Sequence, residues 1–177
     1  MDKNINIPNI LGFLRLLIAP LIYLLLVNRD IFTNIHPSWL DFFAAFLFVL
    51  GAITDFFDGY IARNFNQITQ FGKIIDPLAD KMLTLAGFLG LMVLDRANPW
   101  AIYLILTREF FITGLRVAAI GEGKEISASF LGKIKTVIQI FAIGFLIMNW
   151  PFGEALLWLA VIVTLYSGYE YIKEYLK

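Results

Sequence analysis

Four aspartates gather where one long apolar stretch of the sequence ends and the next begins. Asp55 and Asp58 are three residues apart, and Asp76 and Asp80 are four residues apart. On a helix, residues at either spacing share one face, so each pair presents two carboxylates on the same side. Ionised aspartates are costly at membrane depth unless water or a cation neutralises them. The spacing therefore predicts a cation site between two helices.

The chemistry of these side chains limits which cations they could hold. The chain has no cysteine and a single histidine, and carboxylate oxygens suit a hard divalent ion such as Mg²⁺ or Mn²⁺. Four carboxylates could hold two such ions about 4 Å apart, a spacing that clamps the attacking and leaving oxygens of a phosphoryl displacement. We therefore predict a site for two Mg²⁺ or Mn²⁺ ions that acts on a diphosphate.

Three further residues in the same stretch fit a phosphate ligand. Gly59 and Gly72 remove a side chain where a ligand would approach the helix backbone. Arg63 offers a planar guanidinium that can donate two parallel hydrogen bonds to phosphate. An acidic surface loop between two helices would explain the charges, but neither the glycines nor the position beside apolar stretches. A phosphorylated ligand accounts for all of these features.

The complete spacing of this stretch resembles a family signature. From Asp55 to Asp80 the sequence reads Asp-x2-Asp-Gly-x2-Ala-Arg-x8-Gly-x3-Asp-x3-Asp, which is similar, without a gap, to that of the CDP-alcohol phosphotransferases, integral membrane enzymes that make phospholipids. The resemblance implies that Asp80 is the general base that takes the proton of the acceptor hydroxyl. It also implies that the cytidine diphosphate rests against Asp58, Gly59, Ala62, Arg63 and Gly72.

The N-terminal segment is similar to the same family. Pro8 and Asn9 match a motif that borders the nucleotide and diphosphate in its members, whereas Gly12 stands where many members have threonine. Arg15 interrupts the first apolar stretch, and the sequence alone offers it as an anchor that reaches the membrane interface.

Sequence blocks in the second half resemble one branch of the family, the phosphatidylglycerophosphate synthases. These blocks are Arg108-Glu109, Thr113 to Arg116, and Ala128 to Thr136. The resemblance implies transfer of the phosphatidyl group of CDP-diacylglycerol to sn-glycerol 3-phosphate, with release of CMP. It also implies a homodimer in a bacterial cytoplasmic membrane.

Four basic residues outside the signature are candidates to bind the acceptor phosphate. Arg108 and Arg116 are eight residues apart, which places them within about 80° of each other around a helix, and Lys133 and Lys135 begin the next apolar stretch. Arginine suits bidentate recognition of phosphate. Two alternatives stay open: Arg108 and Glu109 could form a structural charge network, and the lysines could be ordinary cytoplasmic anchors.

Composition places the whole chain in a membrane. Of its 177 residues 59% are hydrophobic and 16% are charged, with a mean hydropathy of +0.75, which does not fit a soluble domain. The zero net charge argues against nucleic acid as a partner. We predict one all-α domain over residues 1–177, a polytopic bundle whose six spans of about 20 residues each are Ile10–Val27, Trp39–Arg63, Gly72–Leu94, Pro99–Ile120, Phe130–Asn149 and Phe152–Tyr175.

The basic residues predict the orientation of this bundle, because cytoplasmic segments carry an excess of lysine and arginine. If both termini are cytoplasmic, the opposite side holds only Arg29 and Arg96. The cytoplasmic side then holds Lys3, Arg63, Lys73, Lys124, Lys133, Lys135, Lys173 and Lys177. We therefore expect the acidic stretch and both termini to face the cytoplasm.

The sequence leaves three further functions open. A sister enzyme of the same family would share the signature and use another acceptor, such as phosphatidylglycerol, inositol phosphate or serine. An ion-coupled transporter could use the carboxylates, but Gly59, Arg63 and Gly72 would then have no purpose. A non-catalytic membrane scaffold would need no buried charges.

Overall fold

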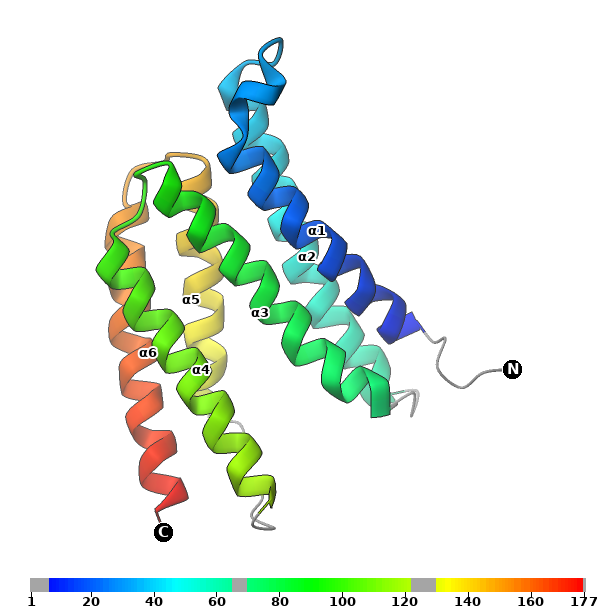
Figure 1. The fold of residues 1–177 in the computed structure, drawn as a ribbon. Coiled ribbons are helices and arrows are strands. Elements are labelled where there is room, and N and C mark those ends of the chain that lie inside the picture. Colours follow the sequence, from blue (N-terminus) through cyan, green and yellow to red (C-terminus); the bar gives the residue numbers. More distant parts are fainter. Residues whose placement is uncertain (1–6, 65–69, 122–129, 177) are drawn as a thin grey trace. The chain divides into compact units, whose positions relative to one another are not determined.

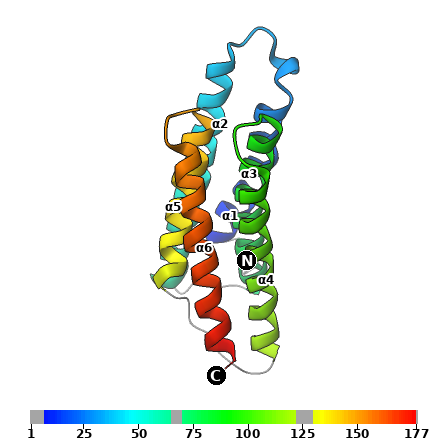
Figure 2. The ribbon, with the colours of Figure 1, turned by 90° about the vertical axis from the view of Figure 1, so that its left-hand side faces the viewer.

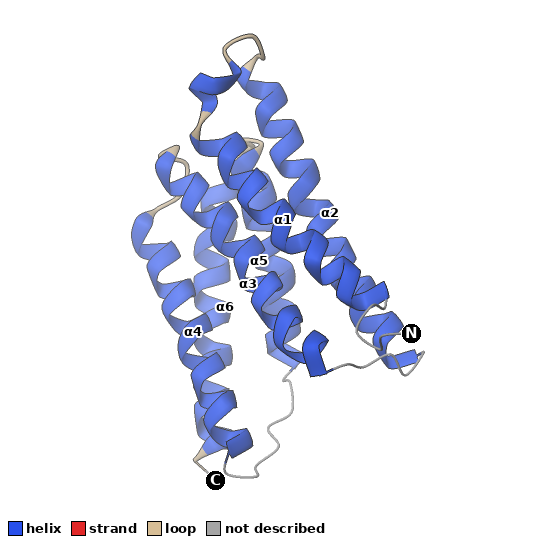
Figure 3. Ribbon diagram, turned by 45° about the vertical axis from the view of Figure 1, so that its right-hand side comes forward, coloured by secondary structure: helices blue, strands red, loops and turns tan. Residues whose placement is uncertain are grey.

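The fold is all-helical over the residues that the structure, a computed structural model, describes. These are 7–64, 70–121 and 130–176, with side chains described for 9–55, 78–119, 121 and 130–176. Within them the chain forms helices and loops but no strand (Figure 3). The elements are α1 (Ile7–Val27), the short 3-10 helix η1 (Arg29–Phe32), α2 (Pro37–Asn64), α3 (Gln70–Val93), α4 (Pro99–Gly121), α5 (Phe130–Ile147) and α6 (Gly153–Tyr175).

Each of the six predicted spans is a long α-helix, with ends that differ by a few residues from the expected ones. In the part of the chain that the structure describes, four helices contain a segment long and apolar enough to cross a membrane, namely Asn9–Val27, Pro37–Asp55, Phe130–Ile147 and Gly153–Tyr175. The all-α prediction is confirmed for these residues, and the chain is an integral membrane protein. The count of six spans and the side on which the termini lie stay predictions.

The chain forms two compact units, residues 1–95 and 96–177, and the single domain over 1–177 stays a prediction. In the first unit, α1 packs against both α2 and α3 (Figure 1). The buried residues of α1 recur every three or four positions, which is the spacing of one helix face; they are Ile18, Ala19, Ile22, Leu25 and Leu26. Arg15 lies on the same stripe and is also buried.

An ion pair closes the turn between α1 and α2. Arg29 of η1 donates a hydrogen bond to Asp41 Oδ1 of α2. Its Nε also donates to the carbonyl of Leu26 at 3.2 Å, one of the acceptors that the end of a helix leaves unsatisfied. This pair therefore ties the end of α1 to the first turns of α2.

In the second unit, α6 packs against both α4 and α5 (Figure 2). Arg96 Nη1 donates to the carbonyl of Ile147 at 2.7 Å, which satisfies an acceptor at the end of α5. Asn98 Oδ1 accepts a hydrogen bond from the backbone N–H of Trp100 at 2.9 Å and so caps the first turn of α4. Both contacts hold the helices at the end where α4 begins.

Large apolar side chains point outward from both units. Leu17 is 69% exposed, Phe46 55%, Phe141 58% and Ile162 64%. Soluble proteins rarely expose apolar surface on this scale, whereas helices in lipid do so at little cost. These side chains suit contact with lipid.

A test of the first unit concerns Gly90 of α3. A Cβ at this position would lie 2.6 Å from Leu26 Cδ1 and 2.9 Å from Leu26 Cβ, so Gly90→Ala should push α1 away from α3. We expect it to lower the free energy of unfolding by about 1–3 kcal/mol, the usual cost of overpacking, measured by thermal unfolding in detergent.

The matched control is Gly144→Ala in α5, where a Cβ meets no described atom within 4 Å. This variant should keep or raise the Tm, because alanine favours helix over glycine. A Gly90→Ala variant as stable as the wild type would contradict the close contact between α1 and α3.

Candidate functional site

The acidic stretch occupies the end of α2 and the beginning of α3, which pack against each other in the first unit. Of its predicted site residues, Asp55, Asp58, Gly59, Ala62 and Arg63 lie on α2, and Gly72, Asp76 and Asp80 lie on α3. The structure therefore places the two aspartate pairs on consecutive helices, as predicted. The side chains of residues 56–77 lie outside the described residues, which include Asp55 and Asp80 of the four aspartates.

Asp55 forms an ion pair with Arg15 of α1, whose Nη1 donates a hydrogen bond to Asp55 Oδ1. The Arg15 side chain is 0% exposed, whereas the Asp55 side chain is 39% exposed. Arg15 is thus not the interfacial anchor that the sequence alone offered, because the helix places it on the packed face of α1. One oxygen of Asp55 is held from inside the unit, and the carboxylate is still open to a ligand.

Asp80 is partly exposed on α3. The Thr84 hydroxyl donates to the backbone carbonyl of Asp80 at 3.2 Å, a bond within the helix that does not use the carboxylate. Asn9, in the first turns of α1, is 3% exposed, and the side chain of Pro8 lies outside the described residues. Among the described side chains, which include only two of the four aspartates, no three histidine, cysteine, aspartate or glutamate residues come together.

The second unit contains a buried polar network around Glu109 of α4. Lys135 Nζ of α5 donates to Glu109 Oε1, and Gln139 Nε2 reaches the same oxygen at 3.4 Å. Gln139 Nε2 also donates to Thr164 Oγ1 of α6 at 2.9 Å. Lys135 is 8% exposed, so it is more than an anchor at the membrane surface. The network joins all three helices of the unit.

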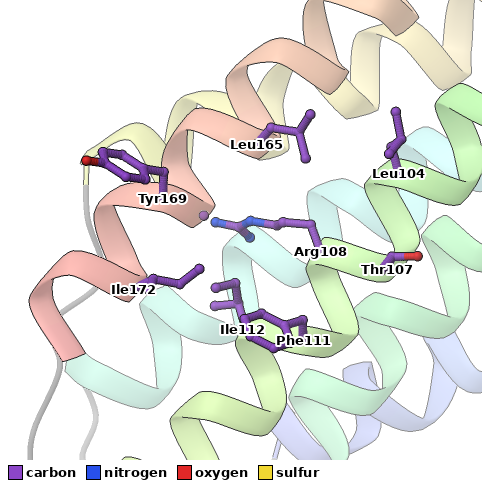
Figure 4. A pocket seen from close by; sticks show the side chains of 9 residues that line it. Leu104, Thr107, Arg108, Phe111, Ile112, Leu165, Tyr169 and Ile172 are labelled. Atoms are coloured by element: carbon purple, nitrogen blue, oxygen red, sulfur yellow. The ribbon is translucent and has the colours of Figure 1, made fainter. Parts of the chain in front are cut away.

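Arg108 turns from α4 toward α6 (Figure 4). Its Nη2 donates to Ser167 Oγ at 2.9 Å, while Nη1 lies 3.4 Å from Glu109 Oε1. A Cβ on Gly168 would stand 3.1 Å from Arg108 Cγ and Nε, so the glycine makes room for the guanidinium. Nε is buried without a hydrogen-bond partner among the described residues.

Arg108 also lines a pocket of about 300 Å³ between α4 and α6. Apolar side chains make up most of its wall, among them Leu165 and Ile172 of α6 (Figure 4). Arg108 is the charged residue among the side chains that line this pocket, and its Nε is itself buried. The pocket thus places one cationic side chain beside a mostly apolar wall.

The other two predicted acceptor residues lie farther out. Arg116 is exposed, and its Nε donates to the Tyr171 hydroxyl at 3.3 Å. Arg116 Cζ lies 5.4 Å from the centre of the Tyr171 ring, within the range of a cation–π interaction. Lys133 is exposed at the beginning of α5. The structure thus joins Arg108 and Lys135 through Glu109 and keeps Arg116 and Lys133 outside this network.

The α6 side of this network was not predicted from the sequence. Thr164, Ser167, Gly168 and Tyr171 are all buried. Their spacing of three and four residues places them on one face of α6. A stripe of small and hydroxyl residues in an apolar helix was the signal that could have revealed this polar seam.

The proteins that this chain resembles belong to one enzyme family. Residues 5–166 match the family model described as CDP-alcohol phosphatidyltransferase. The chain is 36% identical to a Bacillus subtilis protein named CDP-diacylglycerol–glycerol-3-phosphate 3-phosphatidyltransferase, over 96% of this chain and 94% of the relative. A Rickettsia prowazekii protein of the same name is 39% identical, over 98% and 96%. A Mycobacterium tuberculosis protein named probable phosphatidylglycerophosphate synthase is 37% identical, over 97% and 82%.

The Glu109 network can be tested by breaking and then removing its ion pair. Glu109→Gln should lower the free energy of unfolding by about 3–5 kcal/mol, because it leaves the buried Lys135 ammonium without its carboxylate. Adding Lys135→Met should restore much of the loss, since removing both charges of a buried pair is often nearly neutral. Thermal unfolding of the single and double variants decides the matter. If the double variant lost as much stability as Glu109→Gln and Lys135→Met lose separately when added together, the two charges would not depend on each other.

Proposed function

The chain belongs to the CDP-alcohol phosphatidyltransferase family, and on that premise we propose that it transfers the phosphatidyl group of CDP-diacylglycerol to sn-glycerol 3-phosphate. The products are phosphatidylglycerophosphate and CMP, and the reaction is a step in phospholipid synthesis. The observation that carries the proposal is similarity along almost the whole chain to relatives named for this reaction.

We propose that Asp55, Asp58, Asp76 and Asp80 hold two Mg²⁺ or Mn²⁺ ions. The donor set fits such ions, because carboxylate oxygens are the ligands that hard divalent cations prefer. The accessible Asp55 carboxylate, held at one oxygen by Arg15, supports this role. When bound, divalent ions neutralise the diphosphate and stabilise the departing CMP.

The same region would bind the lipid nucleotide and activate the acceptor. Asp80 is proposed as the general base, because its carboxylate stands at the end of the signature and is partly exposed. Arg63 would donate to the diphosphate, and the glycines would let the ligand approach the helices. The proposed nucleotide site comprises Pro8, Asn9, Asp58, Gly59, Ala62, Arg63 and Gly72.

Arg108, Arg116, Lys133 and Lys135 are proposed to bind the phosphate of sn-glycerol 3-phosphate. Arg108 has the strongest support, because its guanidinium is largely buried and keeps a donor without a partner in the described part of the chain. Lys135 already contacts one anion, the Glu109 carboxylate. The phosphate of the acceptor would be a second anion beside Arg108 and Lys135.

We further propose a bundle of six spans with both termini and the acidic stretch on the cytoplasmic side of a bacterial cytoplasmic membrane. The distribution of basic residues supports this orientation, and the relatives are bacterial. A homodimer is proposed on family resemblance. Phe42, Phe43 and Phe46 of α2 are exposed, and such a face can pack on a second copy or on lipid.

Product analysis tests the reaction. Purified protein in lipid should receive CDP-diacylglycerol with an equal mixture of glycerol 3-phosphate, inositol phosphate, serine and phosphatidylglycerol, and mass spectrometry should find phosphatidylglycerophosphate and an equal amount of CMP. Chelator should stop the reaction, and Mg²⁺ or Mn²⁺ should restore it. Asp58→Asn, assembled in the membrane, is the inactive control. A different headgroup in the product would identify a sister enzyme, and full turnover without metal would contradict the two-ion site.

The acceptor site predicts a selective defect in Arg108→Ala. Losing a hydrogen bond to a charged group costs roughly 1.5–3 kcal/mol, so kcat/KM for glycerol 3-phosphate should fall about tenfold to a hundredfold. Affinity for CDP-diacylglycerol should change little. The control is Arg29→Ala in the first unit, which breaks the ion pair between Arg29 and Asp41. It should leave the constants for both substrates unchanged. Unchanged acceptor kinetics with a lower Tm would make Arg108 purely structural.

A further inference from the structure

Arg15 is a charged residue on the buried face of α1, where the neighbouring positions are apolar. It continues the buried stripe of α1 that includes Ile18, Ala19 and Ile22. Its side chain is 0% exposed, and its helix is long and apolar enough to cross a membrane. A buried ion is costly in such surroundings even when it is paired.

Stability alone does not account for this pair. Replacing a buried ion pair with apolar side chains of similar size is often neutral or stabilising. The pair between Arg29 and Asp41 is different, because it ties the η1 turn to α2. The pair between Arg15 and Asp55 joins the middle of α1 to the first carboxylate of the acidic stretch.

We propose that Arg15 is a positioning residue for the cation site, an inference that rests on the proposed function. Arg15 Nη1 holds Asp55 at Oδ1, and the side chain of Asp55 is still 39% exposed. The buried guanidinium thus fixes one carboxylate oxygen and leaves the other available to a divalent ion. Removing a group that holds a ligating carboxylate in this way typically changes metal affinity or activity about 10–100-fold.

The contact also orients the Asp55 carboxylate before a cation arrives. A carboxylate that is already oriented loses less conformational freedom when a cation binds. Lysine has the same charge as arginine but a single ammonium in place of a planar fork. Position and charge can therefore be separated by comparing Arg15→Lys with Arg15→Gln.

The experiment measures Mn²⁺ affinity by electron paramagnetic resonance on the full chain in detergent. Arg15→Gln should weaken Mn²⁺ binding about tenfold to a hundredfold, and Arg15→Lys should give a smaller but clear loss. Arg29→Gln, which breaks the other arginine–aspartate pair described in the unit, should bind Mn²⁺ like the wild type. Asp55→Asn supplies the reference for a lost ligand.

Several outcomes would overturn the proposal. Wild-type Mn²⁺ affinity in Arg15→Gln would make Arg15 only a packed counter-charge, and wild-type affinity in Arg15→Lys would show that charge, not position, is what matters. If Arg15→Gln fails to assemble, Arg15→Lys decides alone. A wild-type protein that binds no Mn²⁺ would also overturn it.

The measurement separates this proposal from the proposed reaction, because Mn²⁺ affinity needs no lipid product. A wild type that binds Mn²⁺ through an Arg15-dependent site but forms no phosphatidylglycerophosphate would refute the reaction and leave the role of Arg15 in place. Product formation together with Mn²⁺ affinity that is independent of Arg15 would do the reverse.

Discussion

Moving a charged side chain out of water costs several kcal/mol unless a group of opposite charge lies beside it. In helices this apolar, each buried charge needs such a partner. Ion pairs between different elements meet this need among the described residues: Arg15 with Asp55, Arg29 with Asp41, and Lys135 with Glu109. Each pair joins two different elements. The helices must therefore pack in a way that brings the paired charges together.

The packing of the helices also holds the charged side chains of the proposed sites in place. Apolar packing fixes α1 against α2 and α3 and fixes α6 against α4 and α5. On these rigid faces Arg15 holds a carboxylate of the proposed cation site, while Ser167 and Gly168 seat Arg108. Residues with side chains held in this way are suited to catalysis, because little reorganisation is needed when a ligand binds.

Much of the fold could be predicted from the sequence, because long apolar stretches separated by turn residues have few other solutions in a membrane. The helices begin and end close to the expected residues. The location of the acidic stretch on two consecutive helices also followed from local spacing. Membership of the family followed from the signature, and the match over residues 5–166 confirms it.

Long-range pairing could not be predicted, since it depends on how helices rotate against each other. Arg15 finds its partner 40 residues away, and nothing local in the sequence points to Asp55. Glu109 follows Arg108 directly, yet its closest cationic contact is with Lys135. Adjacent residues on a helix point to different sides, so the sequence neighbour was a poor guide to the partner.

If Arg15 positions Asp55 as proposed, the pair between them serves chemistry and not stability. The most direct measurement is phosphatidylglycerophosphate formation by a variant that carries Arg15→Met and Asp55→Leu, beside one that carries Arg29→Met and Asp41→Leu. We predict that both assemble with near-normal Tm, that the first makes no product, and that the second keeps its activity. Product formation by the assembled Arg15→Met, Asp55→Leu variant would contradict the account.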